Sequence, residues 1–295
     1  MIVVCMVIRN WVGCLLFIVN TPVFAFDVIE WFTDDKKDVE YFSTNGTYSI
    51  GADTLKLVLD SISEFEVHLK YASISRINTQ LRTTPNSCVA NRIKTQSRET
   101  ENVFSLPLNI HPLARLYFLE NNIIIPSNLL NDKGELLNIL ALSEVNPEKT
   151  LGLTRGVSYG EAIDEQVKVL SQKNLVYFNS DDRYSMGMKL LSDNLVDLNL
   201  AYPSQMQALS RSDKINRRVV SLPVHQKNQF LITHIACSDS SFGKKVIEVI
   251  NKKLIQLYGS DKHKQAHLTH IPLPDHPSFI RDYQNFFTPL KIPSN

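Results

Sequence analysis

The segment CVANRIKTQSRETENVFSLP, residues 88–107, decides the fold prediction for this chain. It begins with an uncharged apolar stretch, passes through a polar loop, and places Thr95 before Gln-Ser-Arg-Glu as the N-cap of a helix. Arg98 falls in the first turn of that helix, where a cation opposes the helix macrodipole. This position is favourable when an anion lies between the guanidinium and the free backbone N–H groups, and a carboxylate suits the arrangement.

Size and charge restrict the classes of protein to consider. The chain has 295 residues, of which 43% are hydrophobic and 21% charged, which is enough apolar content for one large or two medium cores. The formal net charge is +1 and no basic run exceeds a pair of residues, so the electrostatic footprint of a nucleic-acid-binding protein is missing. On charge alone, the expected partners are small or neutral.

The first 25 residues are typical of a secretory signal peptide. They contain Arg9 as the single charged residue, an apolar run over 11–19, and a small-residue cleavage pattern that ends at Ala25. We expect cleavage after Ala25 and export to the periplasm. A membrane anchor is the weaker alternative because the apolar run is too short to span a bilayer comfortably. Initiation at Met6 instead of Met1 would give a more typical leader.

Strand-like and helix-like segments alternate along the rest of the chain in two series. In the first series, strands are predicted at 27–33, 66–72 and around Cys88, and helices at 53–62 and 74–81. In the second, helices are predicted at 135–143, 160–172, 183–193 and after Pro203, and strands at 150–154, 175–178 and 195–200. A strand at 229–237 and a helix at 242–258 follow. Such alternation indicates an α/β fold with mostly parallel sheets and helices on both faces.

Two extended runs, at 113–119 and 219–222, are predicted to carry the chain out of the first lobe and back into it. The expected division is a signal peptide over 1–25, a first lobe over 26–117 and 222–295, and a second lobe over 118–221. A ligand would lie in the cleft between the lobes, at the carboxyl ends of the parallel strands.

The strand, the Thr-x-x-Arg helix start, and Phe104, Ser105 and Pro107 after it resemble the first lobe of the type 2 periplasmic solute-binding proteins. The resemblance is to family 3, the group that includes amino-acid receptors, and extends more weakly over nearly all of the chain after residue 26. It implies a monomer without a cofactor or catalytic step that delivers a solute to an ABC permease or a sensor receptor. It also implies that Arg98 pairs with a ligand carboxylate, with Thr95 and Asn91 in the same site.

The loop LTRGVSYG, residues 153–160, permits two interpretations. It matches G-x-S-x-G with Ser158 as the nucleophile of a secreted serine hydrolase, although an oxyanion loop is missing upstream and only scattered partners, Asp197, His225 and His234, follow. Alternatively, its glycines let the backbone approach a ligand. The family resemblance favours the second interpretation, with Arg155, Ser158 and Tyr159 contacting the solute.

Further candidate ligand contacts lie where two predicted strands end. Phe32 and Asp34 follow the first strand, where the resemblance implies an aromatic wall and an acid at the ligand; core packing and a solvated turn are the alternatives. Tyr202 and Gln205 follow the last parallel strand of the second lobe.

The chain departs from amino-acid receptors at two positions of this motif. Leu200-Ala201-Tyr202 carries no carboxylate for a ligand ammonium, and Ile93 stands where those receptors have a hydroxyl residue. An ammonium buried without an anionic partner would cost several kcal/mol. We therefore expect a carboxylate-bearing or polar ligand other than an α-amino acid held in the usual way. A scaffold that has lost ligand binding is the other interpretation.

Cysteines and histidines leave two more alternatives open. After the leader, Cys88 and Cys237 remain, as either a disulfide or two buried thiols; the resemblance places their strands side by side and favours the disulfide.

His263, His267 and His270 would share one face of a helix and could bind zinc, although a solvent-exposed cluster is the commoner arrangement. We expect no metal site.

Overall fold

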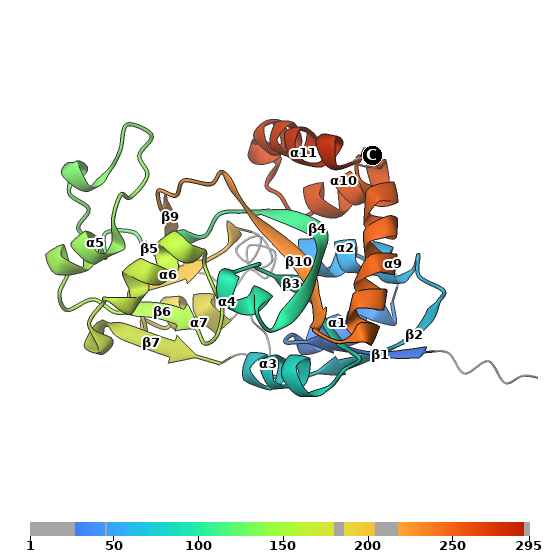
Figure 1. Ribbon diagram of the computed structural model, residues 1–295. Coiled ribbons are helices and arrows are strands. Elements are labelled where there is room, and N and C mark those ends of the chain that lie inside the picture. Colours follow the sequence, from blue (N-terminus) through green and yellow to red (C-terminus); the bar gives the residue numbers. More distant parts are fainter. Residues whose placement is uncertain (1–26, 45, 180–185, 204–217, 292–295) are drawn as a thin grey trace, which may run out of the picture.

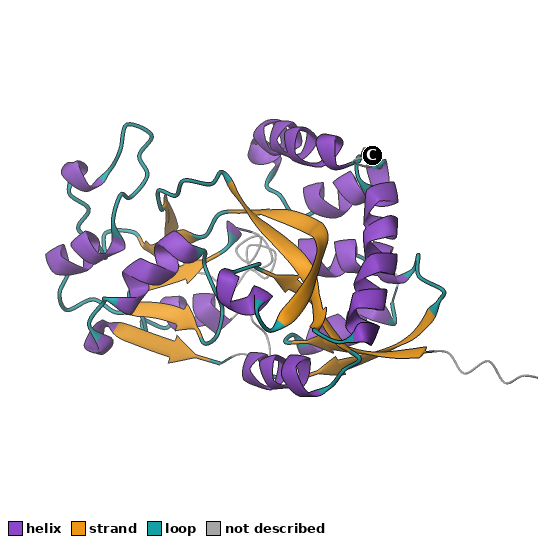
Figure 2. Ribbon diagram, viewed as in Figure 1, coloured by secondary structure: helices purple, strands orange, loops and turns teal. Residues whose placement is uncertain are grey.

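The computed structural model describes residues 27–44, 46–179, 186–203 and 218–291. They form two lobes that lie side by side, each built on one sheet with helices packed against it (Figures 1 and 2). The predicted leader, 1–25, lies outside the described residues. Within the described part of the chain, no helix is both long enough and apolar enough to cross a membrane.

The first lobe contains a five-stranded sheet with the strand order β2-β1-β3-β10-β4. Its strands are β1 (Asp27–Thr33), β2 (Phe65–Tyr71), β3 (Ser87–Arg92), β4 (Asn102–Pro112) and β10 (Phe230–Ser238). The first three are parallel, whereas β10 pairs antiparallel with both β3 and β4. Because β10 comes from the end of the chain, the sheet joins two distant parts of the sequence (Figure 1).

Helices cover both faces of this sheet. They are α1 (Lys36–Phe42), α2 (Ile50–Leu59), α3 (Ile74–Thr83), the single turn α4 (Gln96–Glu99), α9 (Ser241–Leu257), α10 (Asp261–Leu268) and α11 (His276–Leu290). Serine hydroxyls accept from backbone N–H groups at the starts of several of them, as Ser49 does for α2 and Ser240 for α9. A large core that includes Trp31 and Tyr258 fills one face, and a smaller core with Phe32 and Ile77 fills the α3 side.

The second lobe has its own five-stranded sheet, in the order β7-β6-β8-β5-β9. Its strands are β5 (Arg115–Leu119), β6 (Leu151–Thr154), β7 (Leu175–Phe178), β8 (Leu198–Ala201) and β9 (Val219–Pro223), and its helices are α5 (Ile139–Val145), α6 (Glu161–Lys168) and α7 (Met186–Ser192). Three short 3-10 turns complete the described elements: η1 (Ser127–Leu129), η2 (Gln172–Asn174) and, in the first lobe, η3 (Leu273–Asp275). β6, β7 and β8 are parallel, and β5 is antiparallel to its neighbours. The predicted α/β fold with mostly parallel sheets is confirmed.

The chain passes between the lobes twice. The predicted crossing segments, 113–119 and 219–222, overlap β5 and β9, which pair with each other inside the second sheet. The connections therefore lie just outside these strands, at 113–114 and 224–229, where Figure 1 shows two segments running between the lobes. The division at residues 118 and 221 stays a prediction.

The predicted disulfide is present. Cys88 of β3 and Cys237 of β10 are directly opposite in the sheet register, their Cα atoms are 4.1 Å apart, and their sulfurs are bonded. Both side chains are fully buried. The bridge ties two strands that are 149 residues apart in sequence and fixes β3, which ends at the site described next.

Candidate functional site

A cavity of about 100 Å³ lies between the lobes and is lined from both. The first lobe contributes Asp34 after β1 and residues 89–93 at the end of β3, and the second contributes 156–158 after β6 and Tyr202 after β8. The cavity thus lies at the carboxyl ends of parallel strands in both sheets, where open α/β folds bind their ligands.

Arg98 lines this cavity from the first lobe. Its backbone lies in α4, where Thr95 Oγ1 accepts from Arg98 N at 3.4 Å, and its Nη1 donates to Ile93 O at 2.9 Å. Within the described ranges no carboxylate forms an ion pair with the Arg98 guanidinium. Burial lowers the pKa of Arg98 from its ordinary value, opposed in part by the Asp164 carboxylate and Tyr202. The guanidinium is therefore a half-buried cation, and only one of its five N–H groups is used in the hydrogen bond to Ile93 O.

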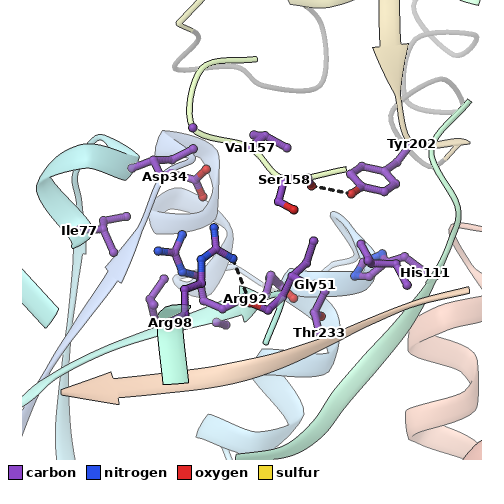
Figure 3. Close-up of a pocket in the computed structure, with 17 residues that line it drawn as sticks. Asp34, Gly51, Ile77, Arg92, Arg98, His111, Val157, Ser158, Tyr202 and Thr233 are labelled. Atoms are coloured by element: carbon purple, nitrogen blue, oxygen red, sulfur yellow. Dashed lines mark hydrogen bonds between the residues drawn. The ribbon is translucent and has the colours of Figure 1, made fainter. Parts of the chain in front are cut away.

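Arg92 and Asp34 lie on the same wall of the cavity as Arg98. Figure 3 shows the two guanidinium groups close together, with the Asp34 carboxylate nearby. Arg92 Nη2 donates to Asn78 Oδ1 of α3, and both Arg92 and Asp34 have further contacts within the protein. The first-lobe wall thus carries two positive groups and one negative group.

The lining residues Asn91 and Thr233 belong to a hydrogen-bonded network centred on the buried Asn109. Asn109 Nδ2 donates to Asn91 Oδ1 at 3.0 Å and to Thr54 Oγ1 at 2.9 Å, and the Thr233 hydroxyl donates to Asn109 Oδ1. Asn91 has a φ of 58°, a left-handed conformation that asparagine tolerates better than most residues. A Cβ at Gly51 would overlap the Asn91 side-chain amide, so this glycine leaves the space that the Asn91 side chain occupies.

The second-lobe wall is held together by Ser158. Ser158 Oγ donates to Asp164 Oδ2 at 2.5 Å, and the Tyr159 N–H donates to Asp164 Oδ1 at 2.8 Å. Tyr202 Oη donates to Ser158 O at 2.9 Å, which anchors the tyrosine ring beside the loop (Figure 3). Gly156 and Gly160, with φ of 77° and 101°, supply the left-handed turns that this loop requires.

The lobes touch each other around the cavity. A Cβ placed on Gly156 would lie 3.1 Å from Ile74 Cγ2 of the first lobe. On another side, the rings of His111 and Tyr202 have centroids 6.4 Å apart. The described conformation therefore has its two lobes in contact across the cleft.

The structure brings together some of the predicted site residues but not all of them. Those that line the cavity are Asp34, Asn91, Arg98, Ser158 and Tyr202. Gln205 lies outside the described residues. The remaining predicted contacts, Phe32, Thr95, Arg155 and Tyr159, are not among the residues that line it.

Each of these four has a different neighbourhood. Phe32 packs in the core beneath α3, and Thr95 Oγ1 caps α4. Arg155 is exposed and lies over the ring of Tyr177, 5.4 Å from its centroid. Tyr159 is 5% exposed because its ring stacks on Tyr202 and its hydroxyl accepts from Thr154 N. In this conformation Tyr159 supports the loop from behind.

The residues proposed for a serine hydrolase are not assembled around Ser158, whose hydroxyl donates to Asp164. The other candidates are engaged elsewhere: Asp197 with Lys149 and Thr150, His225 with Glu135, and His234 with Ser105 O. A serine nucleophile needs a base that accepts its proton, usually a histidine. The geometry of the described residues does not favour the hydrolase alternative.

The expectation of a solvent-exposed histidine cluster is wrong, because His263, His267 and His270 are all buried. His263 bonds to Tyr283 and Leu108 O, His267 to His263 O and Ile110 N, and His270 to Asp53. In the described part of the chain, no group of three or more histidine, cysteine or acidic side chains is arranged to hold a metal ion. The short Asp261–Leu268 helix instead docks on β4 through His263 and His267, and His270, just after the helix, bonds to Asp53 of α2.

Arg92, His111 and Thr233 also line the cavity, and the sequence analysis missed them. Arg92 could have been found, because it ends the strand that leads to the Arg98 motif. His111 and Thr233 come from the long antiparallel pair β4 and β10, whose register fixes their position. No local sequence signal marks that register.

No protein family model and no curated protein sequence matches the chain. Solved structures do match its fold. One is a structure described for glutathione import via GshT and the cystine ABC importer TcyBC of Streptococcus mutans, with a TM-score of 0.62 and 11% identity over 83% of this chain and 95% of that one. An arginine-specific periplasmic binding protein of Salmonella typhimurium matches with a TM-score of 0.58 and 13% identity over 83% of this chain and 100% of that one.

A histidine kinase sensor domain with similarity to periplasmic binding proteins matches with a TM-score of 0.59 and 10% identity, over 83% of this chain and 96% of that one. Identities this low establish the fold alone. Two lobes, two crossings and a cavity at the strand ends agree with these matches. The chain has the two-lobed α/β fold of the type 2 periplasmic solute-binding proteins, as its sequence predicted.

Proposed function

We propose that this protein is an exported solute-binding protein that captures a small carboxylate-bearing or polar solute in the cleft between its lobes. The observation that carries the proposal is the Arg98 guanidinium, which lines the interlobe cavity without a carboxylate partner among the described residues. A half-buried cation gains most from an anion that can use its free donors, and a carboxylate can accept two parallel hydrogen bonds from it.

Closure of the lobes gives a binding mechanism without a chemical step. Arg98 would anchor the carboxylate, and Ser158 and the backbone of 156–158 would contact the same solute from the second lobe. Because only the closed conformation offers both sets of contacts, the solute stabilises that conformation by the difference in affinity. The connections at 113–114 and 224–229 would act as the hinge.

The location of the protein and the partner that receives it are also part of the proposal. The signal peptide predicted over 1–25 would place the protein in the periplasm as a monomer. Proteins of the same fold serve ABC importers or form the sensor domain of a histidine kinase, as the matched structures illustrate. Either an ABC permease or a sensor receptor would receive the loaded protein.

The test measures the thermal midpoint of unfolding of the refolded, solute-free protein against panels of carboxylates, amino acids, polyamines and short peptides. A solute present at about 100 times its dissociation constant contributes about 2.7 kcal/mol to the free energy of unfolding, and so raises the midpoint. We expect a carboxylate to produce this shift.

Arg98→Ala should abolish the shift, and Arg82→Ala is the matched control. Arg82 is exposed on α3 in the same lobe and pairs with Glu101 at 3.3 Å, away from the cavity. A carboxylate that stabilises wild type and Arg82→Ala but not Arg98→Ala supports the proposal. A shift that survives in Arg98→Ala, or the absence of any shift in all panels, contradicts it; the second outcome would favour a scaffold that does not bind solutes.

A further inference from the structure

The charges around the cavity are unevenly distributed between its two walls. On the first-lobe wall, the guanidinium groups of Arg92 and Arg98 face a single carboxylate, that of Asp34, which is already engaged within the protein. On the second-lobe wall, the described lining residues are Gly156, Val157, Ser158 and Tyr202, none of which is acidic. Among the described residues that line the cavity, positive groups therefore outnumber negative ones.

Asp164 lies behind the second-lobe wall, and both oxygens of its carboxylate accept hydrogen bonds from the loop. One oxygen accepts from Ser158 Oγ at 2.5 Å and the other from Tyr159 N at 2.8 Å. Ser158 lines the cavity, whereas Asp164 does not. A positive group on the solute would therefore meet the oxygen of a hydroxyl that has already donated its proton, and not a carboxylate.

This arrangement discriminates against solutes that carry an ammonium beside their carboxylate. With its carboxylate on Arg98, an α-amino acid would bring its ammonium into a partly buried region that holds two guanidinium groups and the Asp34 carboxylate, which already has contacts within the protein. A buried ammonium without an anionic partner costs several kcal/mol, whereas a hydroxyl or a hydrogen at that carbon does not.

The other lining residues indicate a small solute with an apolar body. Ile74, Ile77, Val89 and Leu231 contribute apolar surface to the same cavity. Its volume of about 100 Å³ is well below the roughly 300 Å³ at which ordinary ligand pockets begin. Only a small molecule fits while the lobes stay in contact.

We infer, on the basis of the proposed function, that the solute is a small organic acid anion without an ammonium group. Three features set this preference against zwitterions: Val157 and Ser158 present no acid to the cavity, Asp164 is hydrogen-bonded behind them, and Asp34 already has contacts within the protein.

Calorimetric titration with three pairs of probes tests the inference: lactate and alanine, 2-hydroxy-4-methylpentanoate and leucine, and 3-phenyllactate and phenylalanine. Each pair differs only in a hydroxyl in place of the ammonium, and the pairs span increasing side-chain size. We expect the hydroxy acid of the best-fitting pair to bind at least ten times more tightly than its amino acid, in wild type and Arg82→Ala, and to lose binding in Arg98→Ala.

The outcomes separate the two claims. A preference below tenfold, or a preference for the amino acid, with binding lost in Arg98→Ala, overturns the inference and leaves the proposed function standing. Binding that persists in Arg98→Ala overturns the inference because the solute then lies elsewhere. Failure of all six probes and of the broader panels contradicts both the inference and the proposed function.

Discussion

His263 and His267 are held as neutral imidazoles by their partners. His263 Nε2 donates to Leu108 O at 3.0 Å and its Nδ1 accepts from Tyr283 Oη at 2.7 Å. His267 Nδ1 donates to His263 O at 2.7 Å, and its Nε2 accepts from Ile110 N at 3.3 Å. A proton added to either ring would meet a donor or displace one. Burial lowers the pKa of His263 to about 4 and that of His267 well below its ordinary value, with nearby His263, His111 and His270 adding to the effect on His267.

These shifts predict that the protein loses stability in mild acid. In the unfolded chain both histidines titrate near pH 6.5, so between about pH 6.5 and 4 the unfolded state binds protons that the folded state does not. The free energy of unfolding should therefore fall as the pH decreases through this window, by about 1.4 kcal/mol per pH unit for each histidine.

Urea unfolding at pH values from 7.5 to 5 measures this dependence. His267→Gln should reduce the slope by about one proton, whereas His68→Gln should retain it, because the His68 side chain is 46% exposed. Stability that stays constant or rises from pH 7 to pH 5 would show that these imidazoles are not held neutral in the folded protein.

Individual site residues could be predicted where a local motif marks them. Arg98 was found because a cation at a helix start opposes the helix macrodipole unless an anion lies beside it. Ser158 was found because it lies between two glycines in a strand-to-helix loop. Tyr159 and Arg155 were predicted from the same loop, but the direction of a side chain there depends on φ values that the sequence does not reveal. The turn at Gly156 leaves Arg155 exposed over Tyr177, and Tyr159 lies under Tyr202.

At the scale of elements, the loop between β6 and α6 approaches the first lobe closely at Gly156. Gly156→Ala would force an alanine to a φ of 77° and place its Cβ 3.1 Å from Ile74 Cγ2 across the cleft. We expect a loss of about 1–2 kcal/mol in folding stability from the left-handed backbone. We also expect roughly tenfold weaker solute binding, equivalent to about 1.4 kcal/mol, because the lobes can no longer close fully.

Gly134→Ala is the matched control for this prediction. Gly134 has a φ of 73°, but a Cβ there would have no neighbour within 4 Å. Both variants should lose similar stability in urea unfolding, and only Gly156→Ala should bind the solute more weakly in calorimetric titration. Equal affinities in the two variants would mean that contact between Gly156 and Ile74 has no part in closure.

Element prediction was accurate where periodicity was strong and failed where proline obscured it. β1 and β7 have the predicted bounds, and α9 is displaced by one residue. The predicted helix after Thr95 is only the single turn α4, because the chain enters the long strand β4 at Asn102. Pro272, Pro274 and Pro277 obscure the helical pattern in the sequence, yet α11 begins at His276, since proline is tolerated in the first turn of a helix.

At the scale of the molecule, two sheets joined by two connections explain why the site residues come from distant parts of the sequence. The sequence order of strands predicted two α/β lobes, and the antiparallel return of β10 beside β3 confirmed the position of the Cys88–Cys237 disulfide. The contact between His111 and Tyr202 across the cleft could not be predicted, because it depends on the angle between the lobes and not on either lobe alone.

The most direct test of the central claim, that Arg98 binds the carboxylate of a solute held between the lobes, is a crystal structure of the protein with the carboxylate that stabilises it most. We predict that the carboxylate accepts hydrogen bonds from the Arg98 guanidinium and that the same solute contacts residues 156–158 of the second lobe. A solute bound outside the interlobe cavity, or an Arg98 side chain that is turned to solvent or paired with an acid of the protein, would contradict the account.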